Sequence, residues 1–453
     1  MIRLISLTLI FASITAIPAR ANGWKAGVAK IVITPDPAGW MSGYAARKGP
    51  ATGKAHDLWA KAFALQDVNG KKSVIVTLDV CGITRDVELP VVAEIEKKTG
   101  IPRAGIALSV SHTHCGPVVG DNLISMYPLT ATELAKTKAY TDVLKTKLAS
   151  VAIEAVAGLQ PAQISWGMGK CNFAVNRREN PAEQVPALRQ KLSLKGPVDH
   201  DVPVLVAKGA DGNPLGILTQ YACHCTTLDY DKYSGDYAGY TQIELEKEFP
   251  GAVALFAAGC GADANPLPRR NEEMAIQYGK ELATATVNVV RHGLQPLSGD
   301  RLGVAFEEIP LKLSKIPTKA ELEKELADKN IYIAARAKVL LKKMADDGSL
   351  SPTYPYPVQV WKLGTDLDWF LLGGEVVVDY SLRLKRSNGT NRTWVTAYTN
   401  DVCAYIPSLR VLKEGGYEGA TSMIYYALPS PWAESIEEEI IASIAKLLKS
   451  LNP

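Results

Sequence analysis

Eight apolar runs of strand length, separated by longer stretches suited to helices, constrain the fold of this chain more than any other feature. Several runs are nearly continuous Val, Ile, Leu and Ala, which is typical of strands covered on both faces. The runs lie at residues 72–80, 104–111, 203–209, 214–223, 252–259, 359–364, 368–374 and 393–399. Their alternation with helices predicts an α/β fold with a mixed β-sheet core covered by helices.

Helices are expected at residues 141–159, 271–293, 318–348 and 435–451. In the third stretch, apolar residues recur at three- and four-residue spacing, and the glycine that follows suits a C-terminal cap. The Pro-rich stretch at 351–357 is the best candidate break in the chain. We therefore expect one large domain over residues 22–453, with a helical insertion at about 315–350. Two domains divided near residue 300 are the alternative.

Residues 1–21 have the features of a secretory signal peptide. Arg3 provides a positive start, an apolar stretch follows, and Ala19-Arg20-Ala21 fits the small-x-small pattern of a cleavage site. No later segment reaches about 18 uninterrupted apolar residues. We therefore expect an exported protein, secreted or periplasmic, with no transmembrane anchor after removal of the signal.

The charge balance excludes one class of function. The chain has 50 Lys and Arg residues against 47 Asp and Glu residues. A nearly neutral chain lacks the basic surface that nucleic acid requires, so we exclude nucleic-acid binding.

Six of the seven cysteines lie at or just beyond the ends of apolar runs. In an exported chain, disulfides that brace a pocket are the leading expectation. Burial as small apolar side chains is one alternative, and a thiolate ligand or nucleophile is another. These six residues are Cys81, Cys115, Cys223, Cys225, Cys260 and Cys403.

Polar side chains with metal-binding chemistry follow four of the predicted strands. His112 and His114 follow the run at 104–111, and alternation along a strand would point both the same way. His224, Glu375 and Tyr405 follow three other runs. Each residue alone has an ordinary structural explanation, as a turn residue, a satisfied buried histidine or a helix-start carboxylate. Together they predict a shared crevice beyond the strand ends, where open α/β sheets bind ligands.

A series of motifs resembles one known family. In order along the chain they are "WMSGYAARKGPATGKAHDLWAKAFAL", "HTHCGP", "NRRENP", "ACHCTTLDYDKYSGDYAGY", "GCGADANP", "GGEVVVDYSLRL" and "NDVCAYIPSLRVLKEGGYEGAT". With these motifs the chain resembles the neutral/alkaline (non-lysosomal) ceramidases from about residue 28 to about residue 428. The resemblance implies the catalytic domain of a zinc-dependent amidohydrolase.

The resemblance also implies roles for individual residues. The family's zinc ligands match His112, His224, Glu375 and Tyr405. Its two residues that lie against the substrate match His114 and Arg177; strand geometry alone would let His114 share the metal with His112. Two imidazoles, a carboxylate and a phenolate suit Zn²⁺, which lowers the pKa of a bound water to about 7. The implied reaction is hydrolysis of an N-acyl amide by metal-activated water.

The chain departs from the family at two places. Ala264 occupies the position of the family's nucleophilic serine, and residues 261–266 contain no hydroxyl. We therefore expect direct attack by water, or a role for Asp263 as base or as a residue that orients the site. The chain also has no residues for the family's C-terminal β-sandwich domain, which questions ceramide itself as the substrate.

The leading interpretation is an exported zinc hydrolase that cleaves a small-molecule or lipid amide, as in sphingolipid metabolism. One alternative is a zinc hydrolase on the same scaffold that acts on a small polar or sugar-derived substrate. Another is a non-catalytic binding protein with a structural metal, because structural zinc sites are closed by four protein ligands.

Overall fold

Two five-stranded sheets form the centre of the protein, which the computed structural model describes from residue 23 to residue 452. The first sheet has the order β5-β4-β3-β1-β6 and the second has the order β12-β10-β9-β7-β14. The predicted signal peptide lies outside the described residues. The strands of the two sheets are β1 (Lys25–Val32), β3 (Trp59–Gln66), β4 (Lys72–Leu78), β5 (Ile106–Val110), β6 (Gln160–Pro161), β7 (Gln163–Lys170), β9 (Asp201–Lys208), β10 (Pro214–Tyr221), β12 (Val253–Ala258) and β14 (Gln295–Pro296).

A third sheet has four strands in the order β15-β16-β17-β19, and three two-stranded pairs complete the set. All eight apolar runs form strands in the three larger sheets, which confirms the mixed α/β fold. The strands of the third sheet are β15 (Leu302–Lys312), β16 (Thr353–Leu363), β17 (Leu367–Leu372) and β19 (Thr393–Thr396). The pairs are β2 (Gly53–Lys54) with β11 (Lys232–Tyr233), β8 (Ala174–Asn176) with β13 (Ala264–Pro266), and β18 (Glu375–Val376) with β20 (Tyr405–Ile406).

Each of the three larger sheets contains one parallel pair of strands. These pairs are β4 with β5, β10 with β12, and β17 with β19. The chain beyond β19 then joins the sheets, because Thr396 bridges to Gly259 and Thr399 bridges to Ser109. The carboxyl ends of β5, β10 and β17 are thereby brought to one place, and the segments that follow them can build a common site.

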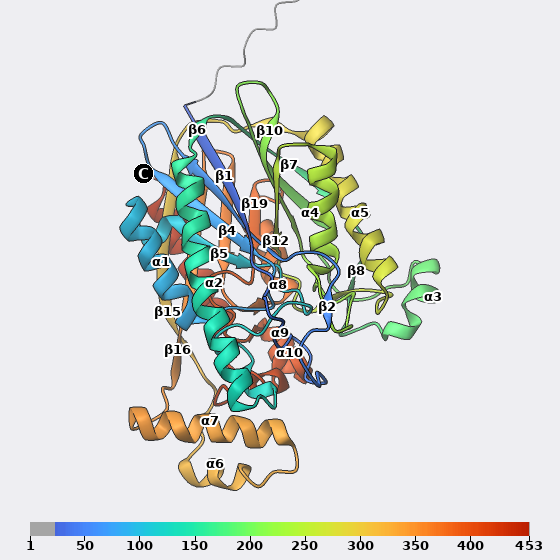
Figure 1. Ribbon diagram of the computed structural model, residues 1–453, viewed down its shortest axis with the longest axis vertical. Helices are drawn as coiled ribbons and strands as arrows, with labels where there is room; N and C mark the ends of the chain where they lie inside the picture. Colours follow the sequence, from blue (N-terminus) through green and yellow to red (C-terminus); the bar gives the residue numbers. More distant parts are fainter. Residues whose placement is uncertain (1–22, 453) are drawn as a thin grey trace, which may run out of the picture.

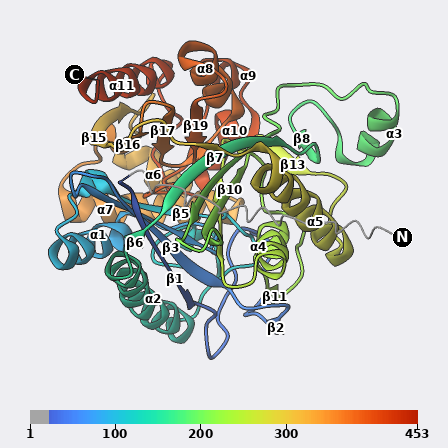
Figure 2. The same ribbon diagram turned by 90° about the horizontal axis from the view of Figure 1, so that it is seen from above.

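Helices cover both sides of this arrangement (Figures 1 and 2). Helices α1 and α2 pack together on one side, and α4 and α5 pack together on the other. Helix α2 begins with a capping box in which Thr130 and Glu133 satisfy each other's backbone N–H groups. The helices outside the insertion are α1 (Arg85–Thr99), α2 (Ala131–Ala157), α3 (Val185–Gln190), α4 (Asp236–Glu248), α5 (Glu272–Asn288), α8 (Val378–Asn388), α9 (Leu409–Glu414), α10 (Gly416–Gly419) and α11 (Ile436–Ser450).

The segment between β15 and β16 forms two helices instead of the single helix expected at 318–348. Helix α6 (Lys319–Glu325) and helix α7 (Ile331–Asp347) project together at the lower end of Figure 1. The break lies where the Asn330 side chain accepts a hydrogen bond from the Tyr332 backbone N–H, which starts α7. Asn stabilises a helix start in this way but competes with helix in the middle of one. Helix α7 contacts the short turns at Ile124–Met126 and Thr421–Ile424.

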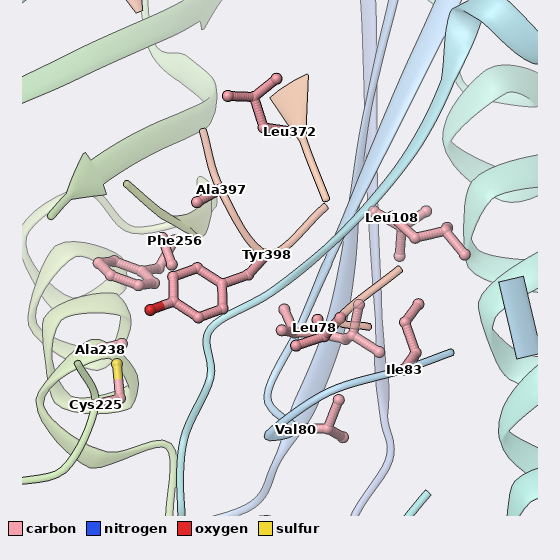
Figure 3. Packing of buried hydrophobic residues seen from close by; sticks show 14 of the residues in the cluster. Leu78, Val80, Ile83, Leu108, Cys225, Ala238, Phe256, Leu372, Ala397 and Tyr398 are labelled. Carbon is pink, nitrogen blue, oxygen red and sulfur yellow. The ribbon is translucent and has the colours of Figure 1, made fainter. Parts of the chain in front are cut away.

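The main hydrophobic core extends to the strand ends where the three sheets meet. Figure 3 shows Leu78, Val80 and Leu108 packed together there, with Tyr398 beyond them. The Tyr398 ring lies 4.6 Å from the His112 ring, measured between centroids. The predicted strand-end crevice is therefore backed directly by core packing.

The seven cysteines, all within the described part of the chain, are buried free thiols. The expectation of disulfides around the pocket is therefore wrong. Six of the thiols lie in the main core cluster, where they pack as small apolar groups. Burial raises the pKa of Cys223, Cys225 and Cys260, so these thiols are poor nucleophiles at neutral pH. Among residues 23–452, no helix has the length and apolar character needed to span a bilayer.

Candidate metal centre

His112 and His114 meet, but in a loop and not on a strand. Strand β5 ends at Val110, and His112 adopts a left-handed backbone conformation with φ of 59°. The two Nε2 atoms lie 3.1 Å apart. The turn of the loop therefore brings the rings together, and the alternation expected along a strand does not apply.

His224 and Glu375 complete a buried group with His112. Oε2 of Glu375 lies 3.2 Å from Nε2 of His112 and 3.1 Å from Nε2 of His224. Each of these three side chains has an exposed fraction of 3% or less. This Oε2 atom is buried and has no hydrogen-bond partner among residues 23–452. These ligand atoms belong to one group that can hold a metal ion.

Backbone carbonyls determine which nitrogen of each histidine faces this group. Nδ1 of His112 lies 2.6 Å from the carbonyl oxygen of Cys81, and Nδ1 of His224 lies 2.8 Å from that of Gly261. A carbonyl oxygen only accepts, so both Nδ1 atoms carry protons and the Nε2 lone pairs of the neutral rings face Glu375. With both rings neutral, two Nε2 atoms and a carboxylate oxygen converge as three buried acceptors. Burial opposes protonation of His112, but the Glu375 carboxylate and Cys81 outweigh it and raise the pKa of this imidazole, so a positive charge is favoured between these atoms. Such an arrangement fits a cation.

The buried carboxylates of Asp79 and Asp236 do not orient the ligand histidines, because each has other partners. Asp79 accepts hydrogen bonds from the Trp59 backbone and the Gln242 side chain. Asp236 accepts from the backbone N–H groups of Leu228 and Tyr237. The two carboxylates therefore hold loops and a helix start, and the histidines are oriented by main chain.

Tyr405 lies beside Glu375 because β18 and β20 pair in parallel, with Glu375 opposite Tyr405. The Tyr405 hydroxyl oxygen lies 3.2 Å from Nε2 of His224. A donor nitrogen of Arg177 lies 3.0 Å from the same oxygen. The tyrosine oxygen thus adds a fourth ligand atom next to the buried group.

Two residues of the site, Tyr426 and Glu418, were given no role by the sequence analysis. The Tyr426 hydroxyl donates a hydrogen bond to Oε1 of Glu375, leaving Oε2 directed at the histidines. Glu418 accepts a hydrogen bond of 2.7 Å from Nε of Arg177 and so fixes the guanidinium beside Tyr405. Both residues lie in the C-terminal part of the chain, and only the folded chain brings them to the site.

Burial and charge set the protonation of the group. Burial, with a further contribution from Arg177, lowers the pKa of His224 to about 4 and keeps this imidazole neutral. Burial would raise the pKa of Glu375, but the interactions with His112 and His224 outweigh it and hold that pKa well below its usual value. Burial, reinforced by Glu375, raises the pKa of Tyr405, so only a cation nearby would stabilise its phenolate.

His114 lies at the edge of the group. It forms a second potential metal-binding set with Cys81 and His112, and it is not part of the set that contains His224 and Glu375. Its Nδ1 atom is buried and has no hydrogen-bond partner in the described part of the chain. Gly43 leaves room for the ring, because a Cβ atom there would lie 2.4 Å from Cγ of His114.

Comparison with known proteins agrees with this geometry. The family model described as neutral/alkaline non-lysosomal ceramidase, N-terminal, matches residues 24–265, more than half of the chain. The chain belongs to this family. Neutral ceramidase B of Dictyostelium discoideum is 29% identical over 224 residues, which cover 46% of this chain and 31% of that protein. Neutral ceramidase 1 of Arabidopsis thaliana is 26% identical over 235 residues, covering 51% of this chain and 30% of that protein.

A solved structure extends the similarity to nearly the whole chain. The crystal structure of neutral ceramidase from Pseudomonas aeruginosa matches with a TM-score of 0.72 at 20% identity, covering 94% of this chain and 74% of that chain. This match shows that the two proteins share a fold. The matched region spans about a third of the length of the curated ceramidase relatives.

In this member of the ceramidase family, the segment around Ala264 supports the site through its backbone. The Ala264 carbonyl accepts a hydrogen bond of 3.0 Å from the backbone N–H of His224. The Asp263 carboxylate accepts from the Val378 backbone and from the Asn176 side chain, and burial raises its pKa to about 6. Asp263 thus connects the segment that carries Arg177 with the helix that follows Glu375.

Two pockets adjoin the group. One has a volume of about 620 Å³ and is lined by Arg177. The other has about 630 Å³ and is lined by Tyr44, whose ring lies 4.7 Å from that of His114. A larger pocket of about 1070 Å³ lies between Cys171 and helix α5 and contains none of the proposed ligand residues.

Proposed function

We propose that the protein is an exported, zinc-dependent hydrolase that cleaves an N-acyl amide bond. The observation that carries this proposal is the convergence of two Nε2 atoms and one carboxylate oxygen, each oriented by a separate hydrogen bond. Membership of the neutral ceramidase family supports amide hydrolysis as the reaction. The proposed export rests on the signal-like sequence of residues 1–21, and the proposed domain comprises residues 22–453.

His112, His224, Glu375 and Tyr405 would hold the metal through two nitrogens and two oxygens, the donor types that zinc accepts. When bound, zinc supplies Lewis acidity, which polarises a carbonyl group and lowers the pKa of water. The backbone carbonyls of Cys81 and Gly261 keep both imidazoles in the binding tautomer. Tyr426 keeps the carboxylate of Glu375 turned toward them.

Arg177 and His114 would act on the substrate. The guanidinium of Arg177 is held by Glu418 beside the ligand atoms, where it can stabilise the negative charge that develops on an amide oxygen. His114 directs its Nε2 atom at the group, 3.1 Å from Nε2 of His112, and burial lowers its pKa well below the usual value, so the neutral imidazole is suited to hydrogen-bond to the reacting group of the substrate. Because residues 261–266 contain no hydroxyl, the nucleophile is water and no serine ester forms.

The alternative of a purely structural metal predicts no turnover. A structural metal does not explain why Arg177, which lines a pocket, donates a hydrogen bond to the Tyr405 oxygen. A small polar substrate, by contrast, is favoured by the charged and amide side chains of that pocket.

Metal content and hydrolysis of the purified protein test the proposal together. We expect one zinc per chain by mass spectrometry. We also expect cleavage of a short-chain fluorescent N-acyl-sphingosine or a simpler N-acyl amide that stops on chelation and returns with zinc. A protein that contains no metal would refute the site, and zinc without cleavage of any amide would refute the reaction.

A further inference from the structure

The pocket of about 620 Å³ beside the metal centre carries several charged and amide side chains. Its lining includes Arg177, Arg178, Asn180, Asn265, Arg269 and Glu418. Arg177 contacts the Tyr405 oxygen, and Tyr417, which also lines the pocket, has its ring 5.3 Å from that of Tyr405. A group bound in this pocket therefore lies next to the proposed ligands. The charged and amide side chains can hydrogen-bond to a polar half of a substrate, and Pro181, Leu267 and Tyr417 add apolar surface to the same pocket.

Two acidic residues of the pocket are already engaged. Glu418 accepts hydrogen bonds of 2.7 Å from both Arg177 and Arg178. Glu414 accepts from Arg178 and from Arg410. These carboxylates neutralise two of the three guanidinium groups in the pocket. A third acid, Glu179, is exposed to solvent.

Arg269 is the guanidinium that remains. Within residues 23–452 it forms no ion pair and no side-chain hydrogen bond, although it is half-buried. The neighbouring Asp229 pairs with Arg270 at 3.0 Å instead. Burial, and then the positive charge of Arg270, lower the pKa of Arg269, and the opposing effects of Tyr44 and Asp229 do not outweigh them. Since a guanidinium stays charged in proteins, the Arg269 side chain can bind an anion.

We propose that Arg269 binds a carboxylate on the amine half of the substrate, so that N-acyl amino acids are cleaved in preference to neutral N-acyl amines. This inference rests on the proposed amide hydrolysis at the metal centre. The planar guanidinium can hold a carboxylate through two parallel hydrogen bonds. The acyl half would then extend from the metal centre on the side away from this pocket.

Two amides with the same acyl chain test whether Arg269 binds the substrate carboxylate. We would measure kcat and KM for N-lauroylglycine and for the neutral N-lauroylethanolamine, using the zinc-loaded full chain. We expect Arg269→Gln to lower kcat/KM for N-lauroylglycine by about 10- to 100-fold, mainly through KM, because a hydrogen bond to a charged group is lost. The same variant should change kcat/KM for the neutral amide by less than about twofold. Lys48→Gln is the control, because it removes one exposed positive charge from the other pocket.

The outcomes separate this inference from the proposed function. If Arg269→Gln affects both amides equally, or the wild type prefers the neutral amide, the inference is wrong and amide hydrolysis stands. If neither amide is cleaved, calorimetric binding of N-lauroylglycine decides. Weaker binding by Arg269→Gln would support the anion site and reject amide hydrolysis, and equal binding would reject both.

Discussion

Replacing Tyr426 with Phe isolates the hydrogen bond that turns Glu375 toward the histidines. The Tyr426 hydroxyl donates to Oε1 of Glu375, and Oε2 lies 3.1 Å from Nε2 of His224 and 3.2 Å from that of His112. The substitution removes one oxygen atom and keeps the ring. It therefore frees the carboxylate to rotate while all four proposed ligands remain.

The expected loss follows from the charge of the acceptor. A hydrogen bond to an ionised group contributes about 1.5–3 kcal/mol. Loss of a residue that orients a metal ligand weakens metal binding by about 10- to 100-fold. We expect Tyr426→Phe to raise the zinc dissociation constant by such a factor, measured by competition with a chromophoric chelator. At saturating zinc, most of the turnover should return.

Tyr425→Phe is the matched control, since no side-chain hydrogen bond of the Tyr425 hydroxyl is present in the described residues. It should leave the zinc dissociation constant within about twofold of the wild type. If Tyr426→Phe also binds zinc as tightly as the wild type, Glu375 does not depend on this hydrogen bond and our account of its orientation is wrong.

Three further predictions concern the site and its support. His224→Ala and Glu375→Ala should each lose zinc and hydrolysis together, by mass spectrometry and assay; a variant that keeps stoichiometric zinc would remove that residue from the ligand set. His114→Ala should keep most of the zinc but lose about 100-fold or more in kcat, and an empty site would instead make His114 a ligand. Burial raises the pKa of Asp236 to about 6, so the native state binds this proton more tightly than the unfolded chain. The wild type should therefore lose stability relative to Asp236→Asn as pH rises from about 4 to about 6 in urea titrations, and parallel stability curves would contradict this.

The local pattern of apolar residues was sufficient to predict much of the fold. The eight apolar runs became strands because a continuous buried strand must be apolar on both faces. Strands such as β3 and β15 were not predicted. Lys61 interrupts the apolar pattern of β3 and is buried only because Glu246 and the Ala254 carbonyl accept its hydrogen bonds. Strand β15 is largely half-exposed and offers little apolar signal.

Helix boundaries depended on features that a periodic pattern does not resolve. Helix α1 was not predicted, and it contains Pro90. The expected helix at 318–348 divides at Asn330, whose side chain starts a new helix. In both cases the outcome depends on individual backbone hydrogen bonds, while the apolar spacing reports only which face is buried.

The sequence by itself determined eight of the strands, the near-neutral charge, and the histidines and carboxylate that follow strand ends. Tertiary structure alone decided which groups support them: the carbonyls of Cys81 and Gly261, and the side chains of Tyr426 and Glu418. It also decided that the cysteines are buried free thiols and that Arg269 is left without an acidic partner. The physical reason is the distance along the chain between the residues that make each contact. Residue type and periodicity report local burial, whereas these contacts join segments that are distant in the chain and meet only after the three sheets have assembled.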